Sequence, residues 1–343
     1  MIPLPHPPRR ISLANLPTRI HPLSRLSAAL GGPEIWVKRD DETGSDLTGN
    51  KVRKLEFLLA EALDQRADLI ITCGGVQSNH CRATAIAARR LGLDSLLFLR
   101  GEDPGTRDGN LLLDALVGAD LRFITPEQYA ARASLMAAAA AELRAAGRRP
   151  YVIPEGGSNA LGSYGYVILF EELASQSAGG GPEWDHIVCA TGSGGTLAGL
   201  ALGAKLAGRR GDGGSNPAQA QVHGVNVCDS ALYFRARAIE IAEEFRQRFL
   251  PESTAPLLAA EEVSVIEGYK GPAYAVPYAE ELALIREVGR TEGLLLDPVY
   301  TGKAFHGLVE EVKRGRFARG ERVLFIHTGG AFSLFPYRLD LVD

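Results

Sequence analysis

Short apolar runs alternate with longer helical patterns through almost the whole of this 343-residue chain. The runs typical of strands cover residues 34–38, 69–73, 95–99, 121–124, 151–153, 186–191, 222–227 and 322–328. The stretches with helical periodicity cover residues 52–65, 79–91, 126–146, 194–207 and 278–292. Because apolar strands that alternate with helices form parallel sheets covered on both faces, we predict a doubly wound α/β fold. Two mostly parallel sheets fit the length better than one.

Two polar, glycine-rich segments interrupt the pattern, at residues 175–184 and 208–218. Such composition is typical of solvated loops, and we expect both segments to be surface connections.

Composition excludes several classes of protein. No run of about 18 uninterrupted apolar residues predicts a membrane span, and the proline-rich N-terminus lacks the apolar core of a signal peptide. The four cysteines are scattered without a CxxC pair, so we expect neither a metal site nor a disulfide framework, and a cytoplasmic location. A net charge of −4 with dispersed arginines argues against a nucleic-acid partner.

The segment TGNKVRKLE opens a predicted helix and carries a lysine at its start. Only seven of the 37 basic residues are lysines, and Lys51 is placed at this loop-to-helix junction. The helix dipole there lowers the pKa of an amine, and a neutral amine is what Schiff-base chemistry requires. The alternative is a solvated residue of the first turn, and Lys54 is expected to be a structural or electrostatic neighbour.

Two loops follow strands in a form that suits anions. The segment GGVQSNH, with Ser78, Asn79 and His80, combines a tight glycine turn with a helix start, where exposed amides bind a carboxylate or phosphate; plain helix capping is the alternative. The segment TGSGGT, with Gly192, Ser193, Gly194, Gly195 and Thr196, lets the backbone approach an anion closely. It lacks the Walker lysine and the dinucleotide spacing, so a single phosphate fits it better.

Two further polar segments, DPVYTGK and FIHTGG, follow apolar stretches near the C-terminus. Their hydroxyl groups either cap helices or face a heteroaromatic nitrogen.

Taken in order, the segments KRDDETGSDLTGNKVRKLE, GGVQSNHCRATA, PYVIPEGGSNALG, TGSGGTLAG, DPVYTGKAFHG and LFIHTGGAFSLF resemble one known family. It is the family of D-cysteine desulfhydrases and 1-aminocyclopropane-1-carboxylate deaminases, pyridoxal-phosphate enzymes with the fold of the tryptophan synthase β-subunit. The resemblance spans about residues 10–337. It implies a homodimer with a large cofactor-binding domain, residues 1–49 plus 166–343, interrupted by a small domain at residues 50–165.

The resemblance also implies roles for individual residues. Lys51 would carry the cofactor as a Schiff base and act as the catalytic base. Ser78, Asn79 and the backbone of His80 would hold the substrate carboxylate, with Asn79 also reaching the cofactor. The glycine loop from Gly192 to Thr196 would hold the cofactor phosphate, and Tyr274 and Tyr300 match active-site tyrosines.

Two positions separate the activities within that family. Deaminases carry Glu after the PVY tyrosine and Leu before the final glycine pair, whereas this chain has Thr301 and Thr328, as desulfhydrases do. A carboxylate facing the pyridine nitrogen keeps it protonated, while hydroxyls leave it neutral. We therefore predict β-elimination from D-cysteine and β-substituted D-alanines to pyruvate, ammonia and sulfide, with Tyr300 as the candidate acid. The alternatives are an L-cysteate sulfo-lyase, a deaminase and a non-catalytic ligand sensor.

Overall fold

Ten strands form two sheets in the computed structural model, which describes residues 7–178, 180–208 and 220–342. The larger sheet has the order β1 (Ile20–Pro22), β2 (Glu34–Lys38), β10 (Arg322–Ile326), β7 (His186–Thr191), β8 (Gln221–Asn226), β9 (Ser264–Ile266). The smaller sheet has the order β5 (Asp120–Ile124), β4 (Asp94–Arg100), β3 (Leu69–Gly75), β6 (Pro150–Val152). β1 is antiparallel to β2 and every other neighbouring pair is parallel. The predicted α/β class with two mostly parallel sheets is confirmed.

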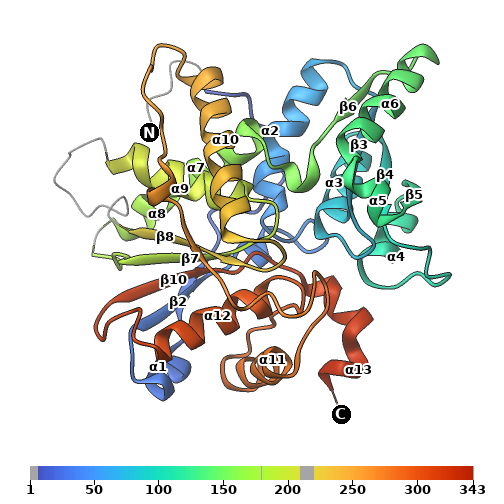
Figure 1. Ribbon diagram of the computed structural model, residues 1–343. Coiled ribbons are helices and arrows are strands. Elements are labelled where there is room, and N and C mark those ends of the chain that lie inside the picture. The colour runs from blue at the N-terminus through green and yellow to red at the C-terminus, as the bar shows by residue number, and fades with distance from the viewer. Residues whose placement is uncertain (1–6, 179, 209–219, 343) are drawn as a thin grey trace.

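Helices cover both faces of each sheet (Figure 1). One face of the larger sheet packs against α1 (Ser24–Leu30), α11 (Ala279–Glu292) and α12 (Thr301–Lys313). Its other face packs against α7 (Ala160–Val167), α8 (Leu169–Ser177), α9 (Gly195–Gly208) and α10 (Ala231–Phe249). The smaller sheet lies between α3 (Asn79–Arg90) with α4 (Gly109–Leu116) and α5 (Pro126–Ala130) with α6 (Arg132–Ala145). The helix α2 (Lys51–Asp64) contacts both α3 and α7, and α13 (Arg338–Leu341) lies near the C-terminus.

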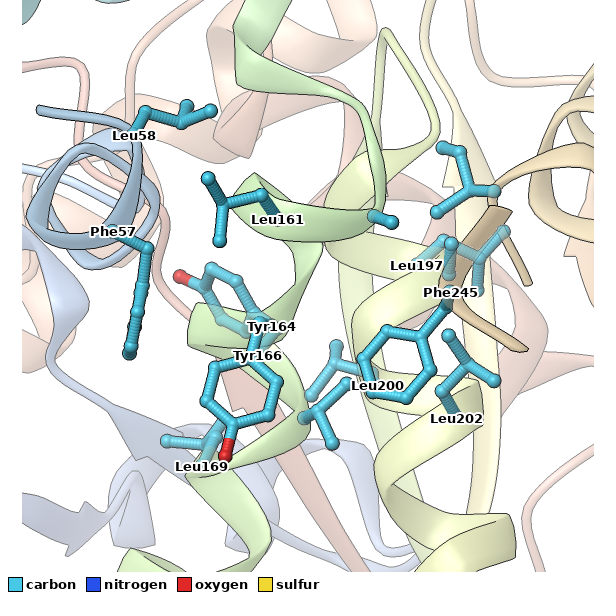
Figure 2. Close-up of a cluster of buried hydrophobic side chains, with 14 of the residues drawn as sticks. Phe57, Leu58, Leu161, Tyr164, Tyr166, Leu169, Leu197, Leu200, Leu202 and Phe245 are labelled. Carbon is cyan, nitrogen blue, oxygen red and sulfur yellow. The ribbon is translucent and has the colours of Figure 1, made fainter. Parts of the chain in front are cut away.

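The largest buried cluster joins the two sheets through α2, α7, α9 and α10. Figure 2 shows Phe57, Tyr164 and Phe245 among its side chains, and the Tyr164 ring lies 5.0 Å from Phe57 and 6.1 Å from Phe245, centroid to centroid. Because large side chains fill this region, truncating one of these rings costs about 3–5 kcal/mol. The cluster fixes the start of α2 relative to both sheets.

The predicted elements differ from the structure in a few places. All eight predicted strands begin and end within two residues of observed ones, but the two short edge strands β1 and β9 were not predicted. The single helix predicted over 126–146 is wrong, because it breaks at Ala131 into α5 and α6. The loop predicted over 175–184 is partly wrong, since α8 extends to Ser177 and Trp184 is buried with its ring 5.6 Å from that of Trp36. In the loop predicted over 208–218, Gly208 ends α9 and the other residues lie outside the described part.

The strands of the smaller sheet all fall between residues 69 and 152, inside the predicted small domain. The larger sheet is built from strands before and after that range, and the boundaries at 50 and 165 stay a prediction. Across the described residues, every helix is too short or too polar to pass through a membrane. The predicted cytoplasmic location stays a prediction too.

Candidate active site

A cavity of about 300 Å³ opens where β3, β4, β7 and β10 end. In parallel sheets this edge is where ligands bind, because loops and helix starts converge there. Most of the predicted site residues line it: Lys51, Ser78, Asn79, His80, Gly192, Ser193, Gly194, Thr196, Tyr274, Tyr300 and Thr328. Two predicted residues, Gly195 and Thr301, are placed behind this surface.

Lys51 is the first residue of α2, and a tight turn presents it to the cavity. Gly49 makes this turn with a φ of +101°, and a Cβ atom there would lie 2.8 Å from the carbonyl oxygen of Thr328. The Nζ atom of Lys51 donates to Oδ1 of Asn50 at 2.9 Å, and Nδ2 of Asn50 donates to Oγ1 of Thr196 at 3.0 Å. Asn50, which the sequence analysis missed, therefore connects the lysine to the glycine loop.

Burial and, to a smaller extent, the neighbouring charge of Arg82 together lower the pKa of Lys51 to about 8. The largest cause of the shift is burial and not the helix dipole that the sequence predicts. Arg82 of α3 is itself fully buried and donates to the carbonyl oxygens of Asp46 and Thr48. It thus fixes the segment before Lys51 and keeps a positive charge near its amine.

The start of α3 forms a second wall of the cavity. Oγ of Ser78 accepts from the backbone N–H of Cys81 at 3.2 Å, which makes Ser78 the N-cap. Nδ2 of Asn110 donates to Oδ1 of Asn79 at 3.0 Å, so the amide nitrogen of Asn79 is the donor left to face the cavity. The helix start offers donors to an anion such as a carboxylate.

His80 is held as a neutral ring. The hydroxyl group of Thr72 donates to the carbonyl oxygen of Ile153 at 2.8 Å, so it accepts from Nε2 of His80, also at 2.8 Å. Burial and the nearby Lys51 and Lys54 amines lower the pKa of His80 well below its usual value. A ring fixed and neutral in this way is not a proton donor near pH 7.

The glycine loop after β7 faces a buried lysine. Nζ of Lys54 donates to the carbonyl oxygen of Gly156 at 3.2 Å, and a Cβ atom on Gly195 would lie 2.7 Å from that Nζ. The N–H of Gly195 donates to Oγ of Ser158 at 3.2 Å, and that oxygen lies 2.9 Å from Oγ of Ser193. Burial, then the charge of Lys51, lowers the pKa of Lys54 well below its usual value. A bound anion would favour the protonated amine, so these residues suit a phosphate group.

Two tyrosines form another wall of the cavity, and the Tyr300 ring lies against Gly192 of the glycine loop, where a Cβ atom would be 2.9 Å from its Cε1 atom. The hydroxyl oxygens of Tyr274 and Tyr300 lie 2.6 Å apart, and the Lys51 ammonium is 5.9 Å from the centroid of the Tyr300 ring. Burial, then the neighbouring Tyr274, raises the pKa of Tyr300 well above its usual value. Both hydroxyl groups therefore stay protonated near pH 7 and are available as hydrogen-bond donors.

The two threonines have different surroundings. Thr328 lies on the cavity wall. Thr301 is fully buried, and its hydroxyl donates to Oδ1 of Asp297 at 2.7 Å. The hypothesis that both hydroxyls face a heteroaromatic nitrogen is therefore supported by position only for Thr328.

Several lining residues were missed by the sequence analysis because no motif connects them. The cavity is also bounded by Arg100 at the end of β4, by Tyr129 and Arg132 of α5 and α6, and by Glu155 and Asp229. The Tyr129 hydroxyl donates to Oε1 of Glu155 at 2.6 Å, and Arg132 pairs with Oε2 of Glu155 at 2.9 Å. These residues come from both sheets' loops and place charges at the rim.

Comparison with known proteins finds similarity over nearly the whole chain. The family described as "Pyridoxal-phosphate dependent enzyme" matches residues 11–329. The chain is 44% identical over 342 residues to the "Bifunctional D-cysteine desulfhydrase/1-aminocyclopropane-1-carboxylate deaminase, mitochondrial" of Arabidopsis thaliana, covering 96% of this chain and 80% of that protein. It is 41% identical over 335 residues to the "D-cysteine desulfhydrase" of Yersinia pestis (strain Pestoides F), covering 96% of each. A solved structure described as "Crystal Structure Analysis of the ACC deaminase homologue" matches with a TM-score of 0.83 at 38% identity, covering 97% of this chain and 95% of that one.

Proposed function

The chain belongs to the family of pyridoxal-phosphate dependent enzymes and is a lyase of that family, and we propose that it converts D-cysteine and other β-substituted D-alanines to pyruvate, ammonia and the β-leaving group. One observation carries the proposal. The amine of Lys51 lies between a helix start suited to a carboxylate and a glycine loop suited to a phosphate, with paired tyrosine hydroxyls beside it.

The residues of the cavity fit the cofactor. The loop from Gly192 to Thr196, together with Lys54, would hold its phosphate, and Lys51 would bind its aldehyde carbon. A Cβ atom at Gly195 would fill the space against Lys54 and Ser158, at 2.7 Å and 2.5 Å from their Nζ and Oγ atoms. When bound, pyridoxal phosphate supplies an electron sink that stabilises negative charge at the substrate α-carbon.

The protein's own groups then divide the remaining work. Ser78 and Asn79 orient the substrate carboxylate at the start of α3, with the backbone amide of His80. Lys51, whose pKa of about 8 makes its amine far easier to deprotonate than an ordinary lysine, removes the α-proton. Tyr300, held protonated beside Tyr274, donates a proton to the departing sulfur.

The bonds balance without an oxidant or a reductant. The C–S bond breaks with its electron pair going to sulfur, and the α-proton goes to Lys51. The enamine that results takes up one water to give pyruvate and ammonia. Sulfide is the third product when the substrate is cysteine.

The identity of two residues supports desulfhydration over cyclopropane opening. At residue 301, deaminases of the resembled family carry Glu, but this chain has a threonine whose hydroxyl donates to Asp297. Thr328 provides a neutral hydroxyl at the cavity wall. Neither threonine supplies a carboxylate that would keep a pyridine nitrogen protonated.

The test is 2-oxo acid release by the purified holoenzyme from D-cysteine, L-cysteine, β-chloro-D-alanine, L-cysteate and 1-aminocyclopropane-1-carboxylate in parallel. We expect the largest kcat/KM for D-cysteine or β-chloro-D-alanine. A larger kcat/KM for L-cysteate or for the cyclopropane substrate would replace the proposal with that alternative, and no product from any of them would favour a ligand sensor.

A double substitution tests the role of the threonines. Thr301→Glu with Thr328→Leu is expected to shift the substrate ratio toward the cyclopropane compound. Because Glu at 301 would adjoin the Asp297 carboxylate, Thr328→Leu alone and a thermal unfolding curve serve as controls. An unchanged substrate ratio in a folded double variant would contradict the proposal that residues 301 and 328 separate the two activities.

A homodimer is part of the same proposal. Leu116 of α4 and Leu339 of α13 are 76% and 87% exposed, and Arg338 pairs with Asp108 at 2.8 Å, which brings the two helices together. Such apolar side chains favour contact with a second copy. Light scattering would give twice the 36.7 kDa mass of the chain if this is correct.

A further inference from the structure

Arg100 carries a charge at the cavity wall that the proposed chemistry has not used. It is the last residue of β4, and its Cα is the register partner of Gly75 in β3, which leads into the Ser78 loop. The parallel pairing therefore places Arg100 next to the segment that binds the substrate carboxylate, with its side chain in the cavity lining.

Two aromatic rings hold the guanidinium group between them. Its Cζ lies 4.8 Å from the centroid of the Tyr129 ring and 4.8 Å from that of Tyr274. Both rings are fixed through their hydroxyls, Tyr129 by Glu155 at 2.6 Å and Tyr274 by Tyr300 at 2.6 Å. Stacking orients the planar guanidinium but satisfies none of its five N–H donors.

Among the residues that the structure describes, Arg100 has no carboxylate partner. Within the described residues, neither an ion pair nor a hydrogen bond reaches its guanidinium group. The two carboxylates that share the cavity are engaged elsewhere, Glu155 by Arg132 and Tyr129, and Asp229 by the backbone N–H of Ser230 at 2.9 Å. A half-buried cation without an anion has lost part of its hydration, and a bound anion would compensate for that loss.

The position of Arg100 indicates which part of a substrate it would meet. The start of α3 already serves the α-carboxylate. Tyr274 packs over Gly75, where a Cβ atom would lie 3.1 Å from its ring, and its hydroxyl meets Tyr300, the proposed proton donor to the leaving group. Arg100 stacks on that same ring, so it lies on the side of the β-substituent.

We propose that Arg100 is a specificity-determining residue that selects amino acids whose β-substituent carries negative charge or develops it on leaving, such as a sulfonate, a sulfinate or a thiolate. This inference rests on the proposed function, because it names the substrate class of that site. A guanidinium at this place stabilises the electron pair that moves onto the departing group.

The test compares two isosteric amino acids that do not eliminate, aspartate and asparagine, in both enantiomers, by calorimetric titration of the holoenzyme. We expect the wild type to bind aspartate at least tenfold more tightly than asparagine in the productive enantiomer. Arg100→Met should reduce this ratio to within twofold, and Arg100→Lys should keep part of it. The matched control is Arg122→Met, since Arg122 also lies over a ring, that of Phe98 at 5.8 Å, but outside the cavity lining.

An unchanged ratio in Arg100→Met, or no preference for aspartate in the wild type, would overturn the inference. If Arg100→Met fails to fold, Arg100→Gln provides the same loss of charge with polar atoms retained. The proposed function can fail separately. If the wild type releases no 2-oxo acid from any β-substituted alanine, β-elimination is excluded. If the wild type nevertheless prefers aspartate and Arg100→Met does not, the inference about Arg100 still holds.

Discussion

The hydroxyl oxygens of Tyr274 and Tyr300 lie 2.6 Å apart, although the two residues belong to separate segments of the chain. Lys303 explains how the pair is held. Its fully buried ammonium donates to the carbonyl oxygens of Lys270, Ala273 and Val276 at 2.7, 2.8 and 3.0 Å, and so fixes the loop of Tyr274 to the helix that follows Tyr300. One helix, α12, therefore positions both phenols.

Removing the Tyr300 hydroxyl should slow the reaction most for substrates whose leaving group must be protonated. We expect Tyr300→Phe to lower kcat for D-cysteine by roughly a hundredfold or more, the usual size of a general-acid effect. Chloride leaves without protonation, so β-chloro-D-alanine should lose less than tenfold. Steady-state kinetics on both substrates, with Tyr274→Phe as the comparison, decides the matter. Equal losses on the two substrates would remove Tyr300 from the role of acid.

Cofactor uptake should depend on pH through Lys51. Only the neutral amine attacks an aldehyde, and burial with Arg82 lowers the pKa of Lys51 from 10.5 to about 8. The rate of uptake by the apoenzyme should therefore rise about tenfold per pH unit below 8 and level off above it, followed as visible absorbance after mixing with pyridoxal phosphate. Lys51→Ala should never develop the band. A midpoint near pH 10, or a band in that variant, would contradict the assignment.

Sequence patterns located eight of the ten strands but several helices poorly. Continuous apolar runs such as His186–Thr191 are typical of strands buried on both faces, and the structure has that strand at the same residues. The helix α7 was missed because all of its residues from Ala160 to Val167 are buried, which leaves no amphipathic period to detect. Neither proline nor glycine marks the break at Ala131, so the alanine-rich helical pattern gives no signal for it.

The site was predictable where a loop follows a strand and unpredictable where distant segments meet. Ser78 and the loop at Gly192 follow β3 and β7 directly, so their place at the sheet edge follows from topology. Arg100 is approached by Tyr129 and Tyr274, at sequence separations that no short motif spans. The low pKa of Lys51 likewise depends mainly on burial, which only the folded chain supplies.

Lys54 should lower the stability of the apoenzyme and raise the affinity for pyridoxal phosphate. In Lys54→Met the phosphate would lose a charged donor worth about 1.5–3 kcal/mol, so we expect pyridoxal phosphate to bind roughly tenfold to a hundredfold more weakly. Without the cofactor, the buried amine has no anion to pair with, and its replacement should raise the free energy of unfolding by about 1 kcal/mol. Cofactor titration and urea unfolding of the apoenzyme measure the two changes. The control Lys313→Met, at an exposed lysine, should change neither the affinity nor the stability. A lower free energy of unfolding of the apoenzyme in Lys54→Met would contradict the prediction.

Arg53 should be the largest single contributor to the stability of the site's framework. It is buried two residues after Lys51 and pairs with Asp40 at 2.7 Å and Glu172 at 2.8 Å. Arg53→Met would leave the fully buried Asp40 carboxylate without its cation, and we expect a loss of about 3–5 kcal/mol at pH 7 in urea unfolding.

The pH dependence of that loss identifies its source. In the wild type, burial acts to raise the pKa of Asp40, but Arg53, with smaller contributions from Lys38 and Tyr166, outweighs it and the pKa is lowered. The stabilisation is therefore present above the unfolded pKa and disappears as pH falls through the folded one. In Arg53→Met the largest cause opposing burial is lost, although Lys38 and the Tyr166 hydroxyl still act to lower the pKa of Asp40. We expect burial to prevail, so that the folded pKa rises above the unfolded value and the variant regains stability as Asp40 takes up a proton. The difference between the two proteins should therefore shrink between pH 7 and pH 5. A difference that stays constant over this range would mean that lost packing around the arginine stem, rather than an unpaired carboxylate, destabilises the variant.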